Sequence, residues 1–531
     1  MRKTVHSTGP RHLPPPLRGR VGVGGKPPQR EAAQSRQLPH PCPSPGGRGE
    51  TRLPLVGVRV ACSALTLAAT LALGGCAGLL PRSQYTTPAA QLPQAWQQET
   101  VTGSAVAAGE RWWRSFNDPT LSALVERALS TNNNLAAAAI KVRRAQLNAS
   151  LTDTNLTPSV SVSATSNINY DLKRKVDSRS SGVTGSASYE LDLWGKLASA
   201  RDVSRFEAEA TESDRQSTAL ALIGTTAADY WQIGYLNARI ATSKASIAYA
   251  ERILELVNVK YAAGAVSAQD QIQARQTLAS QRAELTQLLR QLSEARNALA
   301  ILFDQAPEHV VAEPQKLPDG PLPEIGAGLP ASVLAQRPDL RAAEQRLRKY
   351  LANVDSTRAS FYPSFTLTGT LGTSSLTLLN VLQNPYAALG AGLTLPFVQW
   401  NTMKLNVEIS KTDYQEAAVN FRQSLYTALS DVENALSARS RYAEENRHLE
   451  ESLALAKRAE ELAEVRYRAG STALQAWLDT QESRRSAEKS LTQNRLNRLN
   501  NLMALYQAVG GPVPLAAPQA SAEVVPAARG N

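Results

Sequence analysis

The most constraining feature of this sequence is a pair of long helical patterns, from about Leu197 to Phe303, that meet at the segment Tyr261–Ser267. Apolar residues recur every seven positions on both sides of this segment: Ile233, Ile240, Ile247, Leu254 and Tyr261 before it, then Leu278, Leu285, Leu292 and Leu299. This spacing predicts coiled-coil helices. A helix from Leu197 to Ala262 would be roughly 100 Å long, far longer than a compact domain is wide.

The body of the chain consists of two similar repeats. A helical stretch begins at Asn134 and ends near Pro158, and a second begins at Asp339 and ends near Pro363, 205 residues later. β-type alternation, a long helix, a Tyr-x-x-Gly turn and a second helix follow in each copy. The turns, at Gly264 and Gly470, lie 206 residues apart, which indicates a tandem duplication.

Each copy predicts two strands with one apolar and one polar face. The apolar positions are Val160, Val162, Ala164, Val183, Ala187, Tyr189, Leu191 and Leu193 in the first copy, and Phe365, Leu367, Leu371, Leu389, Ala391, Leu393, Leu395 and Phe397 in the second. The intervening positions are mostly Ser and Thr. Four strands of about ten or more residues are long enough to cross an outer membrane when tilted.

A water-soluble four-stranded sheet packed on helices is the alternative interpretation of these strands. If the strands lie in lipid, four of them cannot close a barrel, so the chain must oligomerise. Two chains supply eight strands and three supply twelve, and the larger number leaves room for an aqueous channel.

The N-terminal region carries an export pattern. An apolar stretch from Val60 to Leu73 follows Arg59 and ends in Leu73-Gly74-Gly75-Cys76, which resembles a bacterial lipobox, so we expect cleavage before Cys76 and lipidation of this cysteine. Ala77, in place of an aspartate, favours transfer to the outer membrane. Since the export signal begins near residue 55, we interpret residues 1–55 as a wrongly assigned start or a disordered leader.

Charge and cysteine content exclude several classes of site. Residues 1–75 hold eleven Lys and Arg and two Asp and Glu, so only about two of the eleven net positive charges belong to residues 76–531. No nucleic-acid-binding face is expected. Cys42, Cys62 and Cys76 are the three cysteines, so the body contains no disulfide and no cysteine-based metal site.

These signals divide the chain into seven segments. They are the leader (1–55), a lipoprotein signal peptide (56–75), a lipidated N-terminal segment (76–120), the first repeat of one helix, two strands and a helical hairpin (121–304), a proline-rich connector (305–330), the second repeat (331–509) and a disordered tail (510–531).

Several motifs together resemble the TolC-like outer-membrane efflux proteins, and in particular the NodT-type lipoprotein branch, the outer-membrane channels of resistance-nodulation-division (RND) pumps. The resemblance covers roughly residues 80–511. It rests on the two Tyr-x-x-Gly turns and on Arg111-Trp112-Trp113-Arg114-Ser115-Phe116-Asn117-Asp118-Pro119-Thr120-Leu121, Ala128-Leu129-Ser130-Thr131-Asn132-Asn133-Asn134-Leu135, Leu478-Asp479-Thr480-Gln481 and Leu505-Tyr506-Gln507-Ala508-Val509-Gly510-Gly511. Gln399-Trp400-Asn401-Thr402 departs from the family, which often has a glycine-rich turn there.

The resemblance implies an α+β membrane protein that forms a homotrimer. Each chain would give four strands to a 12-stranded outer-membrane β-barrel, continued by a long periplasmic α-helical barrel. The implied partners are an inner-membrane RND pump, a periplasmic adaptor (membrane fusion) protein and outer-membrane lipid. No cofactor is implied, apart from the covalent lipid on Cys76.

The sequence offers little for catalysis. His309 and His448 are the only histidines after Cys76, and neither lies in metal-site or catalytic-triad spacing. A phosphate-binding glycine loop and a nucleophile elbow are also absent. We therefore expect a passive duct, not an enzyme, whose energy comes from a partner.

Function in such a duct depends on its constriction, where a ring of carboxylates would attract cations. Asp270 and Asp479 follow the two turns. Ser267 to Asp270 also reads as a capping box, and Thr472 to Gln475 is expected to cap the second helix, so capping leaves Asp479 unexplained. The family's other acidic position is Ala476 here.

The resemblance also aligns Tyr467 and Thr472 with residues that hold the closed gate, with Arg466 as a neighbouring donor and Tyr261 as the equivalent of Tyr467. Simple exposure at a helical turn is the alternative for these side chains. At the level of the whole protein, the alternatives are the outer-membrane exit duct of a type I protein secretion system and a periplasmic coiled-coil lipoprotein without a pore.

Overall fold

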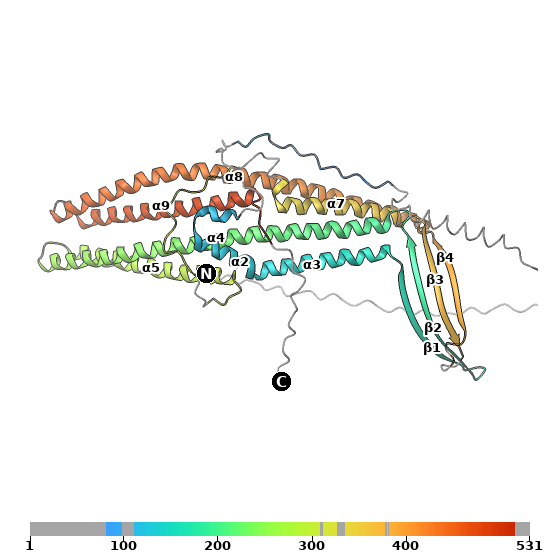
Figure 1. Cartoon of the computed structure of the whole chain (residues 1–531). Coiled ribbons are helices and arrows are strands. Elements are labelled where there is room, and N and C mark those ends of the chain that lie inside the picture. Colours follow the sequence, from blue (N-terminus) through green and yellow to red (C-terminus); the bar gives the residue numbers. More distant parts are fainter. Residues whose placement is uncertain are drawn as a thin grey trace, which may run out of the picture. The chain divides into compact units, whose positions relative to one another are not determined.

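Two long helical hairpins make up most of the described chain (Figure 1). In the first, α4 (Lys196–Ala262) turns into α5 (Ala268–Ile301); in the second, α8 (Trp400–Arg468) turns into α9 (Leu474–Ala508). α4 has 67 residues and α8 has 69, so each is about 100 Å long. The long-helix prediction from heptad spacing is confirmed to within a residue at both ends of α4.

The structure, a computed structural model, describes residues 81–97, 111–307, 312–326, 335–376, 380 and 382–515. All of them belong to one compact unit, residues 73–531. The leader, the signal pattern, Cys76 and His309 lie outside the described residues. So does most of the C-terminal tail.

Four antiparallel strands form one sheet in sequence order. The alternation predicted the four strands, but the predicted positions Leu193, Leu395 and Phe397 lie beyond the ends of the observed strands. They are β1 (Ser159–Asp171), β2 (Val176–Leu191), β3 (Ser364–Ser375) and β4 (Pro385–Thr394). At the end opposite the hairpin turns, the sheet continues directly from the helices (Figure 1).

The strand register separates an apolar face from a hydroxyl face. Val160 pairs with Ala187, which pairs with Gly369, and this residue pairs with Leu389, so the apolar positions share one face. On the other face, the hydroxyls of Ser161 and Ser186 are 2.8 Å apart.

Shorter helices link the sheet to the hairpins. α3 (Asn133–Asp153) leads through η2 (Thr154–Leu156) into β1, and α7 (Pro338–Ala359) leads into β3. α3 packs on α4, α4 on α7, and α7 on α8, so the helices follow the same order as the strands that they precede or follow. α3 and β1 therefore form one edge of the chain, and α8 and β4 form the other.

The largest core lies at mid-length, where η1 (Trp112–Phe116) and α2 (Pro119–Thr131) meet α4 and the end of α9. Trp112 stacks on Tyr506 with ring centroids 4.4 Å apart, and Phe116 packs on Trp231 at 5.0 Å. Two of the motifs that carry the resemblance therefore meet in this core.

The two copies begin their long helices differently. Before α4, Gly195 takes a φ of 74°, and the Asp192 carboxylate accepts from the backbone N–H groups of Leu197 and Ala198. Before α8, η4 (Pro396–Val398) ends at Gln399, and no side chain caps the helix. The departure noted at this position is thus accommodated by a 3-10 turn instead of a glycine.

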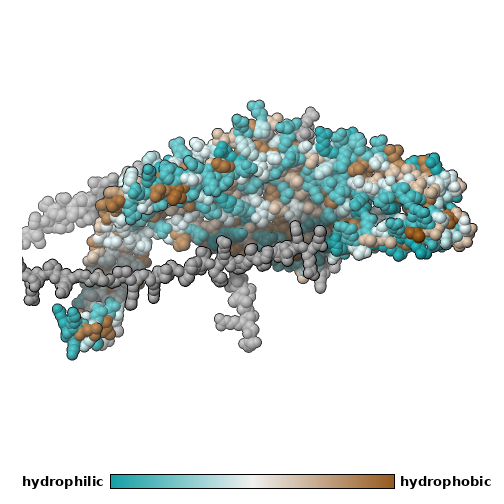
Figure 2. All heavy atoms as spheres, turned by 180° about the vertical axis from the view of Figure 1, so that it is seen from behind, coloured by the Kyte–Doolittle hydropathy of each residue, from teal (hydrophilic) through white to brown (hydrophobic). Residues whose placement is uncertain are grey.

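Among the described residues, no helix is both long enough and apolar enough to cross a membrane. On the face shown in Figure 2, hydrophilic side chains cover most of the helical surface and hydrophobic ones form scattered patches.

Candidate functional site: the seam between the two helical hairpins

The two hairpin turns have the same backbone geometry. In both, the Tyr-x-x-Gly spacing places a glycine at the turn. The N–H of Gly264 donates to the carbonyl of Tyr261 (2.9 Å), and the N–H of Ala265 donates to that of Lys260 (2.9 Å). Gly470 and Ser471 repeat this pattern with Tyr467 and Arg466. Both glycines have positive φ, 72° and 75°, as the C-terminal Schellman motif requires.

The helices that follow the turns are capped differently. Ser267 and Asp270 form the predicted capping box: the Ser267 hydroxyl accepts from the Asp270 N–H, and the Asp270 carboxylate accepts from the Ser267 N–H at 2.9 Å. The prediction that Thr472 to Gln475 caps α9 is wrong. The N-cap of α9 is Ala473, and no side chain caps it.

The repeat register explains this correction. A shift of 206 residues, the spacing of the two turns, places Ser267 on Ala473 and Asp270 on Ala476, so the second copy has lost both members of the capping box. Thr472, one residue too early to cap, is half-buried beside the turn.

Tyr467 is buried, in contrast to its exposed counterpart Tyr261, of which 44% is exposed. Its ring stacks on Trp477 with centroids 5.2 Å apart, and the Lys260 ammonium lies 4.3 Å from its centroid. Exposure at the turn is thus the wrong interpretation for Tyr467, although Arg466 and Tyr261 are exposed.

A small apolar cluster surrounds Tyr467 and joins the hairpins. Ile253, Val257 and Ala274 of the first hairpin pack with Tyr467, Leu474, Trp477 and Leu478 of the second. Tyr249 adds a hydrogen bond from its hydroxyl to Glu464 across the seam (2.9 Å).

Burial shapes the electrostatics of both tyrosines in the seam. It raises the pKa of Tyr249, and the hydrogen bond to Glu464 adds to this shift. It also raises the pKa of Tyr467, with a smaller contribution from the negative charge of Asp270. Both hydroxyls therefore stay protonated at neutral pH. Within the described residues, the Tyr467 hydroxyl has no hydrogen-bond partner.

Asp479 lies on the opposite face of α9 from this cluster. Leu474, Trp477 and Leu478 are buried, whereas Asp479 is exposed and accepts from the Gln475 side chain at 2.6 Å. Capping leaves Asp479 free, as expected. Of the two acidic candidates, Asp270 serves the capping of its helix, and Asp479 takes no part in capping.

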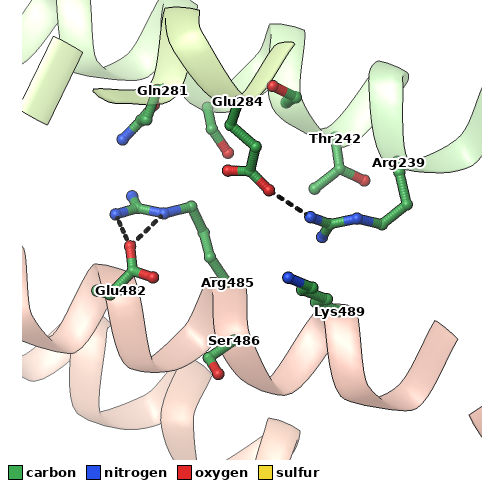
Figure 3. Close-up of a pocket in the computed structure, with 10 residues that line it drawn as sticks. Arg239, Thr242, Gln281, Glu284, Glu482, Arg485, Ser486 and Lys489 are labelled. Carbon is green, nitrogen blue, oxygen red and sulfur yellow. Dashed lines mark hydrogen bonds and ion pairs between the residues drawn. The ribbon is translucent and has the colours of Figure 1, made fainter. Parts of the chain in front are cut away.

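Further along the seam, a polar cavity of about 230 Å³ lies between α4, α5 and α9 (Figure 3). Four of its charged side chains pair within their own hairpin: Arg239 of α4 with Glu284 of α5, and Arg485 with Glu482 of α9. The two hairpins are thus joined more weakly here than at the apolar cluster.

One side chain bridges this cavity. The Gln281 amide, in the orientation that satisfies both neighbours, donates to the carbonyl of Ser246 (2.9 Å) and accepts from Arg485 (3.1 Å). Within the part of the chain that the structure describes, no group of His, Cys, Asp and Glu is arranged to hold a metal ion.

Sequence reasoning missed Lys260, Tyr249, Glu464 and Trp477, which hold the seam. Trp477 carried a readable signal, because Leu474, Trp477, Leu478 and Gln481 recur at helical spacing and define the buried face of α9. Lys260 carried no readable signal, because its contact with Tyr467 joins residues more than 200 positions apart.

The sequence profile of the outer membrane efflux proteins matches residues 124–303 and 329–511. The chain is 31% identical to the pyoverdine export outer membrane protein OpmQ of Pseudomonas putida over 453 residues, which cover 83% of this chain and 96% of that protein. It is also 31% identical to the toxin and drug export protein A of Aggregatibacter actinomycetemcomitans, covering 84% and 97% of the two chains.

Solved structures agree with these matches. The Campylobacter jejuni CmeC outer membrane channel superimposes with a TM-score of 0.76 and 25% identity, covering 82% of this chain and 95% of that one.

Proposed function

On the premise that this chain belongs to the outer membrane efflux protein family, we propose that three copies of it close into one continuous duct. The protein is an efflux channel of the Gram-negative outer membrane that extends into the periplasm. The proposal concerns how many copies form the duct, where it narrows, how it is anchored and which partners supply its energy.

The main support for the trimer is that the two edges of the chain complement each other. In the described part of the chain, β1 and β4 each pair on one side only. Beside β1, α3 exposes Ile140, Leu147 and Leu151, and after β4, α8 exposes Leu405, Ile409 and Val419, all more than half exposed. Unpaired strand edges and apolar helix stripes are unstable in isolation.

A head-to-tail ring satisfies both edges at once. If β4 and α8 of one copy meet β1 and α3 of the next, every strand is paired and each apolar stripe is covered. Three copies supply 12 strands, and the Ser- and Thr-rich face then lines a wet lumen. The long helices continue this ring as a periplasmic α-helical barrel.

The N-terminal strap supports a lipid anchor at Cys76. Arg82 forms an ion pair with Asp202 near the start of α4, and Asp355 near the end of α7 accepts from the N–H and the hydroxyl of Ser83 at 2.8 and 2.6 Å. Both acids lie at the sheet end of their helices. Six residues span at most about 21 Å, so Cys76 is within reach of the same membrane that the sheet would cross.

We place the constriction at the hairpin turns, with Asp479 as its charged residue. In a trimer each Asp479 becomes a ring of three carboxylates on the exposed face of α9. The Tyr467 cluster holds the second hairpin against the first, so loosening this cluster would widen the duct. Because the sequence contains no phosphate-binding glycine loop, we expect an inner-membrane RND pump and a periplasmic adaptor to drive transport.

Conductance tests this assignment. Purified wild-type protein in planar bilayers should conduct, and Asp479→Ala combined with Tyr467→Ala should raise single-channel conductance and lower cation selectivity. Glu451→Gln, which removes an exposed carboxylate about 19 residues before Gly470, is the control and should leave both unchanged. Unaltered conductance and selectivity in the double variant would mean that the duct narrows elsewhere.

A type I protein secretion duct is the second candidate, because one similar protein is named for the export of a toxin as well as drugs. Neighbouring genes decide between the two: a gene for a proton-driven pump supports small-molecule efflux, and a gene for an ABC exporter supports protein secretion. A lipoprotein without a pore would show no conductance at all.

A further inference from the structure

The β1–β2 hairpin carries a basic tip at the end of the sheet that is farthest from the helices. Its loop contains Lys173, Arg174 and Lys175, all exposed. Leu172 beside them is 84% exposed. Three adjacent cations next to an uncovered leucine make this loop both basic and apolar, and this arrangement suits a partner that carries anionic groups on an apolar body.

The nearby carboxylates are already engaged and do not neutralise these cations. The Asp171 carboxylate accepts from the backbone N–H groups of Lys173 (2.8 Å) and Arg174 (3.0 Å), which fixes the turn. Asp177 pairs with Arg179 at 3.1 Å. Within the described residues, the side chains of Lys173, Arg174 and Lys175 form no ion pair.

Strand lengths place this tip beyond an apolar membrane layer. About 9–11 tilted residues cross such a layer, a length that β4 matches with 10 residues, whereas β2 has 16. The pairing of β2 with β3 ends at Ser181, but its pairing with β1 continues for five further residue pairs, to Asp171 and Val176. The additional length is thus at the tip, not at the helices.

The apolar face of β1 leads up to the cations. Ile168 and Tyr170 lie on the face that carries Val160 and Val162, and they are 68% and 57% exposed. An aromatic residue at the end of an apolar strand face is typical of the boundary between lipid tails and head groups. The basic loop follows at head-group level.

We propose that the β1–β2 tip binds phosphate groups on the glycolipid of the outer leaflet, with Leu172 packed against the head groups. This inference rests on the proposed function for the orientation of the sheet, which places the tip on the side opposite the periplasm. Three tips in a trimer would hold a shell of phosphorylated lipid around the mouth of the duct.

The test uses the full-length protein in nanodiscs that contain either a bis-phosphorylated glucosamine-disaccharide lipid or its dephosphorylated form. Each cation near an anionic lipid surface contributes about fivefold to binding. The variant Lys173→Gln, Arg174→Gln, Lys175→Gln should therefore lose on the order of 100-fold in affinity for the phosphorylated lipid, measured as lipid retained per protein by native mass spectrometry.

A charge-matched control and a second readout complete the test. Arg422→Gln, Arg447→Gln, Lys457→Gln removes three exposed cations from α8 and should retain lipid like the wild type. In wild-type protein, trypsin should cut the tip in dephosphorylated discs and not in phosphorylated ones. Equal retention by the two triple variants, or equal cleavage in both discs, overturns the proposal.

Conductance measurements distinguish a failure of this lipid-binding proposal from a failure of the proposed duct. The tip variant should conduct like the wild type in planar bilayers, since the tip lies outside the constriction. A conducting tip variant with undiminished lipid retention would overturn the lipid site alone. A non-conducting wild type would instead overturn the duct on which the orientation depends.

Discussion

At the scale of single residues, the duplication has produced two tyrosines with different environments. Tyr261 and Tyr467 occupy the same position of the same turn, but Tyr467 is buried under Trp477, whose counterpart in the first hairpin is Gln271. Lys260 supplies the cation above the ring. Substitutions in α9, among them Trp477 in place of a glutamine, thus give the second turn a contact surface that the first lacks.

The ring of Tyr467, not its hydroxyl, should hold the seam. Tyr467→Ala removes the stack on Trp477 and the contact with Lys260, and we expect a local loss of about 3 kcal/mol. Tyr467→Phe should have almost no effect, because the hydroxyl has no partner in the described residues. Amide hydrogen exchange across both hairpin turns measures the loss, with Tyr261→Ala as the exposed control. Equal protection in Tyr467→Ala and the wild type would contradict this role.

Asp229 of α4 should make stability depend on pH. Burial raises its pKa to about 6, so the folded state favours the neutral carboxyl. The stabilisation that comes from the neutral form is present below about pH 4 and is lost as the pH rises through 6. The full shift corresponds to roughly 3 kcal/mol, which partial exposure of the side chain reduces to about 1–2 kcal/mol.

Asp229→Asn should therefore raise the melting temperature at pH 7.5 by a few degrees and leave it unchanged at pH 4. Thermal unfolding of the detergent-solubilised protein at the two pH values measures this difference. Glu451→Gln, on an exposed face of α8, should change neither. A gain of equal size at both pH values would exclude the titration of Asp229 as its cause.

At the scale of elements, the sequence was informative wherever a periodic pattern determined the structure. Heptads located α4, and the recurrence of apolar residues at every second position located all four strands, because both patterns repeat over many residues. Local chemistry predicted the cap at Ser267 and failed at Thr472, where the turn positions Ala473 as the N-cap. The burial of Tyr467 was not predictable from its own hairpin alone, because Ile253 and Val257 of the other hairpin pack in the same cluster and Lys260 lies over its ring.

The edge elements should control assembly. Leu147→Glu with Leu151→Glu places charges on the exposed stripe of α3, and burial of an unpaired charge at a subunit contact costs several kcal/mol. We expect monomers in detergent instead of a trimer, measured by light scattering. The control Gln146→Glu, Asn148→Glu adds the same two charges at exposed positions on either side of the stripe of α3 and should leave most of the trimer intact. A trimeric Leu147→Glu, Leu151→Glu variant would remove α3 from the interface.

At the scale of the whole molecule, the helices and strands of each chain follow one order, α3–α4–α7–α8 above β1–β2–β3–β4. In such a chain, α3 lies at the same edge as β1, and α8 lies at the same edge as β4. A single head-to-tail contact can therefore close both parts with the same rotation, which is why one number of copies must serve the sheet and the helices together.

Cysteine cross-linking counts these copies directly, because the body after Cys76 contains no other cysteine. Val162→Cys on β1 is combined in turn with Leu389→Cys, Ala391→Cys or Leu393→Cys on β4, all on the same face of the sheet. Since neighbouring strands bring opposite Cβ atoms to about 4.5–5.5 Å, at least one pair should form a disulfide between copies. The largest covalent product should contain three chains.

The position of the partner cysteine provides the control. Val162→Cys with Leu367→Cys on the inner strand β3 should give no cross-linked species, because both neighbours of β3 belong to its own chain. Cross-linked products of at most two chains would indicate an eight-stranded barrel, and products of more than three chains would indicate an open or larger ring. Only a product of three chains fits a lumen formed by twelve strands.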